Sequence, residues 1–225
     1  MLDLGIDNEL ATNYGLYVLK RPVIPTAKRN VEFIKVPGRH GALTKKGEYE
    51  DVLLSIKFNV LEHDNIKRLI RQAKFWLLNG KTLFFTDDDV YRKIKNVEIG
   101  NIENEIEEYG EFEVSFTFDP FEYVITAPIE LMQSDVVLNI GTFESEPRFE
   151  IYGSGDIKLT INDNPFLIQN VTNSVVIDSE LLTAYSGTVP MRTIGGFPIF
   201  QVGENTIQWS GKVNRIIIEP RWRYV

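Results

Sequence analysis

The segment Phe112-Glu113-Val114-Ser115-Phe116-Thr117-Phe118 alternates bulky apolar residues with polar ones and runs into Pro120. Successive side chains of a β-strand point to opposite faces of the sheet, so this period of two predicts a strand that is buried on one side. The same alternation over Val52–Val60 and over Ile157–Ile161 predicts two more strands of this kind. Short runs rich in Val, Ile, Phe, Tyr and Thr recur elsewhere, so the expected fold is mainly β.

One segment, from Asp64 to Leu78, breaks this pattern and is predicted to be a helix. Asp64 is the expected N-cap and Asn79-Gly80 the expected stop. A single amphipathic helix among strands is expected to pack its apolar stripe on an open sheet face. The spacing of three and four that defines this stripe runs through Ile66, Leu69, Ile70, Ala73, Trp76 and Leu77.

A domain boundary is expected between Pro120 and Pro147, where the patterning becomes mixed. The first half is a strand–helix–strand module, and the second is a series of short strands that favours a sandwich of antiparallel sheets. No internal repeat is present, which argues against a solenoid. The expected turns of the second half are Gly153-Ser154-Gly155, Asn162-Asp163-Asn164-Pro165, Gly195-Gly196 and Gly203-Glu204-Asn205.

The composition is that of a globular protein with one large or two modest domains: 225 residues, 43% of them hydrophobic and 25% charged. The absence of cysteine excludes thiol nucleophiles, disulfide frameworks and thiolate metal sites. A net charge of −8 argues against a protein that wraps nucleic acid, because phosphate binding needs concentrated Lys and Arg. No secretory signal and no run of roughly 18 apolar residues is visible, so we expect no membrane insertion.

Two acidic clusters are candidates for a cation site or a pair of catalytic carboxylates. Asp87-Asp88-Asp89 offers oxygen ligands for a hard cation, but its place between Leu83-Phe84-Phe85 and a strand-like run favours a solvated hairpin tip. A glycosidase needs two facing carboxylates, one with a pKa raised by burial. The second cluster lies in a polar connection, where repulsion and solvent keep its carboxylates ionised; it comprises Glu103, Glu105, Glu107, Glu108 and Glu111.

Other catalytic signatures are missing from the sequence. His40 follows a turn and His63 precedes the helix, and neither has the spacing of a zinc ligand. No Gly-x-Ser-x-Gly elbow occurs, and Gly153-Ser154-Gly155 is not followed by the helix that a phosphate loop requires. We therefore expect no catalytic residue, no metal and no cofactor, and no enzymatic activity.

The closing Pro220-Arg221-Trp222-Arg223-Tyr224-Val225 carries aromatic and basic residues that could stack on bases or sugars. The alternative is a last β-strand that covers an edge or docks a neighbour. We favour the strand, because Ile216, Ile217 and Ile218 predict a buried strand entering it.

Several of these patterns, in this order, resemble the distal tail protein (Dit) family of siphophages. In the first half they are Val36–Leu43, the strand up to Val60, the helix, Leu83–Asp88, and Phe112–Phe121. The succession Pro-Gly-Arg-x-Gly, helix, Asp-Asp and Phe-x-Pro-Phe carries the match. His40 departs from the family, which often has an acidic residue there, and this bears on a polar contact rather than on the fold. The motif residues that the resemblance assigns to structure or assembly are Pro37, Gly38, Arg39, Gly41, Asp88, Pro120 and Phe121.

The second half is similar to the galectin-like domain often found in the same proteins. The resemblance rests on Pro147–Gly155, Val176–Glu180, Gly195–Ile199, Gly203–Ile207 and the closing Arg221, Trp222 and Arg223. It does not imply sugar binding, because galectin-type recognition uses a histidine and this half has none. Trp209 is expected to be a core or rim residue.

The resemblance implies two domains. Residues 1–128 are an N-terminal β-sandwich-like, ring-forming tail-hub domain with one amphipathic helix packed on it. Residues 129–225 are a galectin-like antiparallel β-sandwich, with the alternative that the last strand, about 217–225, returns to the first domain.

The resemblance also implies a function and partners. The chain would be a structural protein of the virion tail tip, assembled in the host bacterial cytoplasm, forming a homo-oligomeric ring, usually a hexamer. The ring would join the tail tube protein to a tail-associated lysin or fibre hub and to a receptor-binding protein, with DNA passing through its lumen without specific binding. The alternatives are a carbohydrate-binding module that attaches to the host surface, and a glycosidase-like enzyme.

Overall fold

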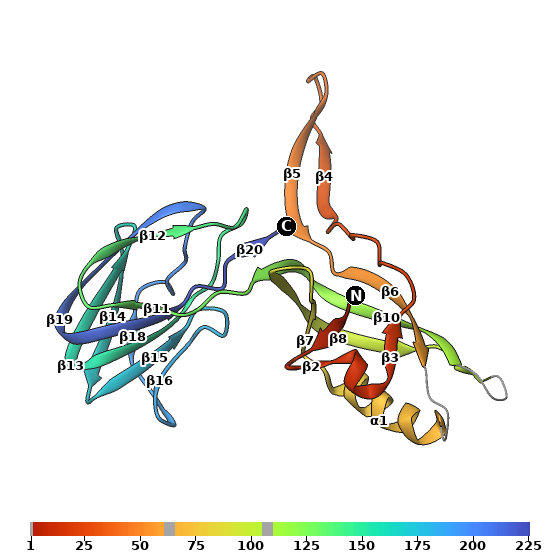
Figure 1. Ribbon diagram of the computed structural model, residues 1–225. Coiled ribbons are helices and arrows are strands. Elements are labelled where there is room, and N and C mark those ends of the chain that lie inside the picture. The colour runs from red at the N-terminus through yellow and green to blue at the C-terminus, as the bar shows by residue number, and fades with distance from the viewer. Residues whose placement is uncertain (1, 61–65, 105–109) are drawn as a thin grey trace. The chain divides into compact units, whose positions relative to one another are not determined.

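A computed structural model describes residues 2–60, 66–104 and 110–225, with residues 66, 103 and 104 described by their backbone alone. The chain divides into two compact units, Met1–Glu122 together with Val225, and Tyr123–Tyr224. The architecture is mainly β, as the sequence predicted, and the described residues form one α-helix (Figure 1). No helix in this part of the chain is long and apolar enough to cross a membrane.

The first unit is built on a curled antiparallel sheet in the order β2-β1-β7-β8-β10-β6-β3, with β9 pairing β10. The 3-10 helix η1 (Ala11–Tyr14) connects β2 to β3. The strands are β1 (Leu4–Ile6), β2 (Glu9–Leu10), β3 (Leu16–Val18), β6 (Val52–Val60), β7 (Thr82–Phe85), β8 (Val90–Ile99), β9 (Glu103–Asn104) and β10 (Gly110–Val124).

The two alternating segments of the first half pair directly with each other as β6 and β10. Phe112 lies opposite Phe58 and Phe116 opposite Leu54, so each buried side chain of β6 from Val52 to Phe58 lies opposite a buried side chain of β10. The predicted period of two is therefore confirmed, and a slip of one residue in this register would turn the apolar side chains of one strand to the opposite face.

The helix α1 (Ile66–Asn79) packs on this sheet, as predicted (Figure 1). Ala73, Trp76 and Leu77 are buried in the core of the unit, and Leu69 packs against it. The helix ends at Asn79, which confirms the predicted stop. The predicted N-cap Asp64 and His63 lie outside the described residues, as does the side chain of Ile66.

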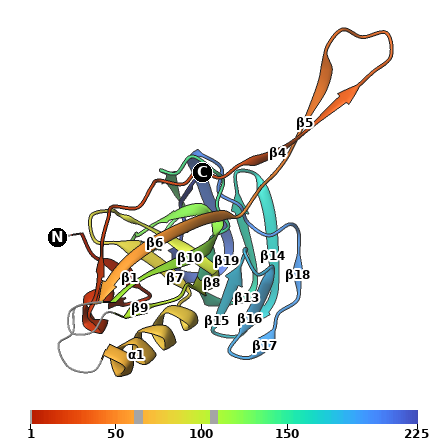
Figure 2. The same ribbon diagram turned by 90° about the vertical axis from the view of Figure 1, so that its right-hand side faces the viewer.

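A two-stranded hairpin, β4 (Arg29–Lys35) and β5 (Ala42–Tyr49), leaves the main sheet of the first unit. Figures 1 and 2 show it standing clear of β6 and β10 in two perpendicular views. Its register places Phe33 opposite Thr44 and Ile34 opposite Leu43. At roughly 3.3 Å per residue, the path from Arg29 to Gly38 spans roughly 30 Å.

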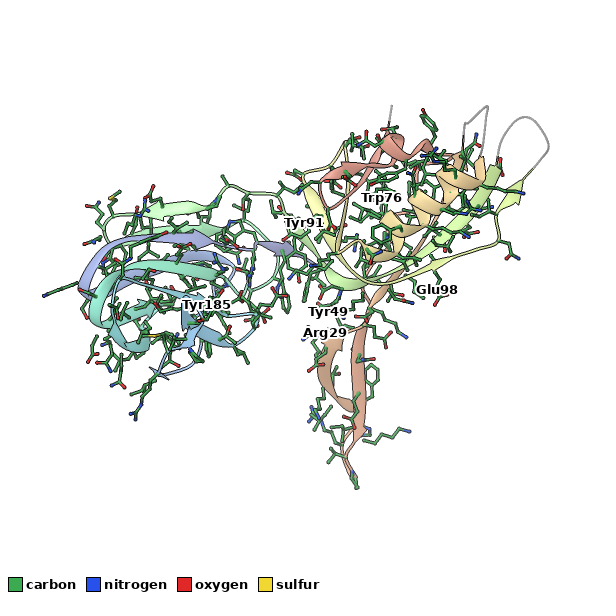
Figure 3. All side chains as sticks on the ribbon, turned by 90° about the horizontal axis from the view of Figure 1, so that it is seen from below. Arg29, Tyr49, Trp76, Tyr91, Glu98 and Tyr185 are labelled. Atoms are coloured by element: carbon green, nitrogen blue, oxygen red, sulfur yellow. The ribbon has the colours of Figure 1, made fainter. Side chains whose placement is uncertain are left out.

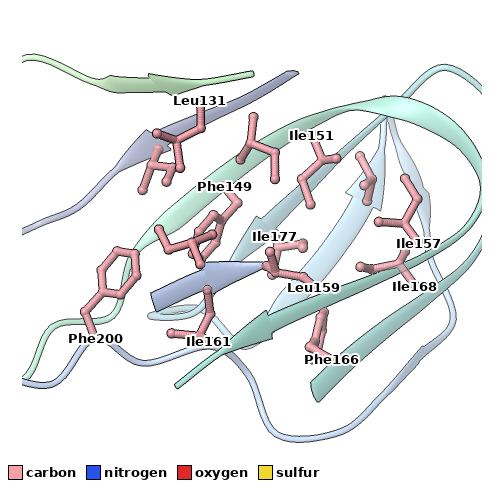
Figure 4. Packing of buried hydrophobic residues seen from close by; sticks show 14 of the residues in the cluster. Leu131, Phe149, Ile151, Ile157, Leu159, Ile161, Phe166, Ile168, Ile177 and Phe200 are labelled. Carbon is pink, nitrogen blue, oxygen red and sulfur yellow. The ribbon is translucent and has the colours of Figure 1, made fainter. Parts of the chain in front are cut away.

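The second unit is an antiparallel sandwich in the order β11-β19-β13-β15-β16-β17, with β12 on β19 and β14 joining β13 to β18. Its core, drawn in Figure 4, is filled by side chains such as Phe149, Ile151, Leu159 and Phe166. The strands are β11 (Ile129–Leu131), β12 (Asp135–Asn139), β13 (Arg148–Ile161), β14 (Asn164–Val171), β15 (Ser174–Asp178), β16 (Thr183–Ser186), β17 (Val189–Pro190), β18 (Thr193–Ile194) and β19 (Gly203–Glu219). The short β20 (Arg223–Tyr224) pairs with β10.

The prediction of a turn at Gly153-Ser154-Gly155 is wrong. These residues lie inside β13, where its register with β19 shifts twice. A Cβ atom on Gly153 would stand 2.3 Å from the carbonyl oxygen of Lys212, so only glycine allows the two backbones to approach this closely. Glycine marks a bulge here, which bends the long β13–β19 ribbon instead of ending a strand.

The turn predicted after Ile161 is confirmed as the β13–β14 hairpin. Asn162 and Asp163 have φ of 48° and 65°. A two-residue hairpin turn with positive φ at both central positions matches the twist of its strands, and Asn and Asp tolerate that conformation.

The closing segment is not the single last strand expected at about 217–225. β19 ends at Glu219, and only Arg223 and Tyr224 form the short β20. Pro220 has no N–H to donate to a sheet, and Arg221 adopts a φ of 52°, which turns the chain out of the extended conformation. Trp222 is thereby turned into the core of the second unit, where it is 3% exposed.

Candidate functional site

The β4–β5 hairpin is the part of the described chain that most clearly lacks a partner. Its two strands form a separate two-stranded sheet, so the outer edge of each carries no further strand among the described residues. A lone hairpin in water is marginally stable, and its unpaired edges can add a strand from another molecule.

Apolar side chains on this hairpin are exposed on both of its faces. Phe33 is 68% exposed, and it shares its face with Val31. Ile34 and Leu43 form a cross-strand pair on the opposite face, and both are exposed to about two fifths. Because no core lies under either face, folding of the single chain does not account for these residues.

The hairpin is basic, although the protein is acidic. Residues 29–49 carry five Lys and Arg against two Glu, a net charge of +3, whereas the whole chain has −8. Glu32 pairs with Lys45 at 3.8 Å in an exposed ion pair, which contributes little stability. A basic projection on an acidic body favours association with an acidic surface.

The tip of the hairpin contains the Pro-Gly-Arg-x-Gly motif. Val36 to Arg39 form a turn in which the N–H of Arg39 donates to the carbonyl oxygen of Val36 at 3.2 Å. Gly38 and Gly41 have φ of 78° and 76°, a region that glycine adopts without strain. A Cβ atom on either would meet nothing within 4 Å, so the described chain leaves the tip uncovered. Pro37 and His40 are exposed there as well.

The root of the hairpin is fixed by aromatic and charged contacts, shown in Figure 3 by the neighbouring Arg29 and Tyr49. The guanidinium of Arg29 lies 5.1 Å from the centre of the Tyr49 ring, and its Nε donates to the carbonyl oxygen of Gly47 at 2.9 Å. Tyr49 contacts Phe121 edge-on, and Lys95 pairs with Asp51 at 2.5 Å. These contacts orient the arm from its base.

Pro120 and Phe121 thus belong to the root, whereas Pro37, Gly38, Arg39 and Gly41 belong to the tip. Pro120 lies beyond the last β6–β10 pair, Phe118 with Val52, so its missing N–H costs no hydrogen bond to β6. The backbone N–H of Phe121 donates to Oδ1 of Asp119 at 3.1 Å.

Asp88 lies in the β7–β8 turn, so the predicted hairpin tip at Asp87-Asp88-Asp89 is confirmed. Asp87 pairs with Arg21 at 2.6 Å, and Oδ1 of Asp88 accepts the N–H of Asp89 at 2.9 Å. Among the described side chains, no three His, Cys, Asp or Glu residues are grouped to hold a metal ion. Of the second acidic cluster, Glu111 lies on the exposed face of β10, while residues 105–109 lie outside the described part.

The three C-terminal motif residues close the second unit. Arg221 binds Asp178 with both terminal nitrogens, at 2.8 and 2.9 Å, and also pairs with Glu180 at 3.2 Å. Arg223 donates to the carbonyl oxygen of Glu144 at 2.6 Å and pairs with Glu146 at 3.1 Å. Trp222 packs against Phe200 with ring centres 5.2 Å apart. They are structural residues of one unit rather than an open stacking surface.

The pKa of Asp178 reflects this environment. Burial by itself would raise the pKa of this carboxyl group, but hydrogen bonds from Arg221 and from the backbone N–H groups of Leu181 and Glu180 outweigh burial and lower it. Hydrogen bonding to Asp178 raises the pKa of Arg221 in turn. The pair therefore stays ionised and locks the turn at Arg221.

Two features were missed in the sequence. Phe33 lies on the exposed face of the hairpin, and Tyr49 makes the aromatic contact at its root. The only signal for them in the sequence is a glycine turn at Gly38 between two strand-like runs. The ion pair between the buried Arg92 and the partly exposed Glu122 has no signal in the sequence, because each residue lies in an ordinary strand pattern.

No protein-family model matches the chain, and no curated protein matches it. Among solved structures, the chain is similar to the Dit protein of phage SPP1, described as a paradigm of the hub adsorption apparatus in phages that infect Gram-positive bacteria. The two chains are 12% identical, each is covered over 100% of its length, and the TM-score is 0.70. The resemblance to distal tail proteins is thus confirmed at the level of the fold.

Two structures of the phage p2 baseplate in its activated conformation, one with Sr and one with Ca, also match. Their TM-scores are 0.48 and 0.45, at 11% and 12% identity. The matches cover 97% of this chain, and 97% and 98% of the respective baseplate chains.

Proposed function

We propose that this chain is a structural, non-enzymatic subunit of a bacteriophage tail tip, and that its copies form a ring hub through the β4–β5 hairpin. The observation that carries this proposal is the exposed, basic hairpin with its apolar Phe33, on a fold shared over the whole chain with the Dit protein of SPP1. A projecting arm of this kind adds little to the hydrophobic core of its own copy, but it can bind the next copy.

Repeated binding of one arm to the next copy gives a head-to-tail contact, which forms a ring when the rotation between copies closes. Burying a side chain such as Phe33 stabilises each contact by roughly 2 kcal/mol. Since every copy in a closed ring uses both its arm and its receiving surface, small contacts add up around the ring. We propose six copies, in line with the resemblance to distal tail proteins.

In this proposal the first unit, Met1–Glu122, forms the ring, and the second unit serves as the module that meets baseplate or receptor-binding proteins. The ring joins the tail tube protein to a tail-associated lysin or fibre hub. The chain acts in the virion, after assembly in the host cytoplasm.

DNA passes through the ring without being held. The net charge of −8 supports this, because a lumen rich in carboxylates repels phosphates. A fluorescently labelled duplex should show no binding to the assembled chain even at low salt, where phosphate contacts are strongest; tight binding there would contradict a passive lumen.

Immunogold labelling of phage particles that contain this chain tests its place directly. Antibodies against residues 123–224 should place gold at the end of the tail opposite the head. Gold on the head, along the tube or only on unassembled protein would contradict the proposed function.

A further inference from the structure

A groove of about 340 Å³ opens on the first unit, and its lining includes the segment Arg21–Pro25, which precedes the hairpin in the sequence. Its floor contains the buried side chains of Leu54 and Leu83. The buried Arg92 also lines it and pairs with Glu122, so this part of the lining carries no net charge. Phe85 adds an aromatic wall. The lining thus favours an apolar side chain.

The lining also includes acidic and exposed apolar residues. Asp87 and Asp88 belong to the β7–β8 turn. The segment Arg21–Pro25 contributes Val23, which is 74% exposed, and Ile24, which is 89% exposed. Arg21 pairs with Asp87, whereas Asp88 is a second carboxylate of the lining, and Asp89 follows it in the same exposed turn.

One face of the hairpin has the matching chemistry. Val31, Phe33 and Lys35 alternate on β4, and Lys46 lies opposite Val31 on β5, so these four side chains share a face. Phe33 lies at the centre of this face, and the basic Lys35 lies two positions further along the strand. The other face carries the Glu32–Lys45 ion pair and has no net charge from that pair.

We propose that this groove binds the hairpin of the neighbouring copy; this inference rests on the proposed ring. Phe33 enters the apolar floor, and Lys35 and Lys46 lie against Asp88 and Asp89. A cavity of about 150 Å³ holds a benzene molecule, so 340 Å³ accommodates the Phe33 ring together with an aliphatic side chain such as that of Val31.

The pairing is between copies, because the hairpin face is exposed in its own chain and the arm leads away from the sheet (Figure 2). The arm and the groove are different surfaces of the same unit. Their contact is therefore heterologous, which is the type of interface that a ring from one kind of chain requires.

Photo-crosslinking from single thiols tests this assignment. The chain has no cysteine, so Lys35→Cys provides one thiol for a maleimide–benzophenone label. Irradiation of the full-length chain in its assembled fraction should join position 35 of one copy to peptides covering residues 21–25 or 83–92 of another. Lys45→Cys is the matched control: it lies on the same hairpin but on the opposite face, and these peptides should not dominate its crosslinks.

Charge exchange gives a second readout that depends on pairing rather than on folding. Asp88→Lys should weaken assembly by about tenfold, and Lys35→Glu in the same chain should restore most of it, since both positions are exposed. Assembled rings whose crosslinks from position 35 fall outside residues 21–25 and 83–92 would overturn the groove assignment while leaving the ring intact. A chain that stays monomeric and gives no crosslink between copies at any concentration would overturn the ring and the groove together.

Discussion

The ring of Tyr49 meets the ring of Phe121 edge-on, with centres 6.2 Å apart and planes at 64°. This contact joins the end of β5 to β10 of the main sheet, and Arg29 of β4 stacks on the same tyrosine. The hairpin therefore has a fixed root, although its far end is uncovered. In the proposed ring, a fixed root keeps the arm oriented before it binds, which reduces the entropy lost on assembly.

Phe121→Ala should loosen this root while leaving the sheet intact, because Phe121 lies beyond the β6–β10 ladder. An aromatic edge contact contributes about 1 kcal/mol, so assembly should weaken by roughly fivefold. Hydrogen exchange of the amides in residues 29–49 should become faster, with no change in β6. Unchanged exchange in the hairpin would show that the contact does not hold the arm.

The bidentate pair of Arg221 and Asp178 should dominate the stability of the second unit. Their side chains are 18% and 6% exposed, so removing one partner leaves a largely buried charge. Arg221→Ala should lower the free energy of unfolding of this unit by about 3 kcal/mol. Arg215→Ala, which removes an exposed pair with Glu130, is the control and should cost less than about 1 kcal/mol. Equal losses in urea unfolding would contradict the importance of the buried pair.

The lowered pKa of Asp178 predicts a pH dependence with a definite sign. Because the folded pKa lies below the unfolded value of about 3.9, the stabilisation is complete above that pH and is lost as the pH falls through the folded pKa. Urea unfolding between pH 6 and 2.5 should show this loss, and Asp178→Asn should reduce the acid-induced part of it.

Tryptophan fluorescence can report this unfolding if the signal comes from the second unit alone. Trp209 and Trp222 lie there, and Trp76 lies in the first unit. The Nε1 of Trp76 has no hydrogen-bond partner among the described residues, so Trp76→Phe removes the fluorescence of this tryptophan without breaking a hydrogen bond. If the urea midpoint of Asp178→Asn falls with pH as much as that of the wild type, the loss of stability in acid does not come from this carboxyl group.

Gly153→Ala should destabilise the second unit by about 2 kcal/mol or more, because the new Cβ atom meets backbone at 2.3 Å. Gly196→Ala is the matched control, since its Cβ atom meets nothing within 4 Å and its φ is ordinary. Thermal unfolding of both variants measures the difference. A Gly153→Ala protein as stable as the control would show that the β13–β19 crossing can relax.

The sequence predicts correctly the strands and the helix end that depend on the pattern of neighbouring residues. The alternation in Val52–Val60 and Phe112–Phe118 reflects one buried face, and the stop at Asn79-Gly80 reflects the helix end itself. Gly153 misled the prediction because glycine marks both turns and close backbone crossings, and only the distant Lys212 decides between them.

The exposed face of the hairpin could not be predicted in the same way. A two-stranded ribbon without a core has no reason to alternate, so Phe33 and Ile34 follow each other and give no period. The role of Phe121 depends on Tyr49, 72 positions earlier in the sequence, and no local pattern records such a contact. On the proposed ring, the hairpin sequence is shaped by its contact with a second copy of the chain.

Native mass spectrometry of the full-length chain, compared with Phe33→Ala and Phe75→Ala, tests the central claim most directly. Phe33 and Phe75 are 68% and 72% exposed, so the two variants remove similar apolar surface from the hairpin and from the helix. The wild type and Phe75→Ala should form a closed assembly of about six 25.8 kDa chains, whereas Phe33→Ala should remain mostly monomeric. A wild type that stays at 25.8 kDa at every concentration, or equal assembly of all three proteins, would contradict a ring built through this hairpin.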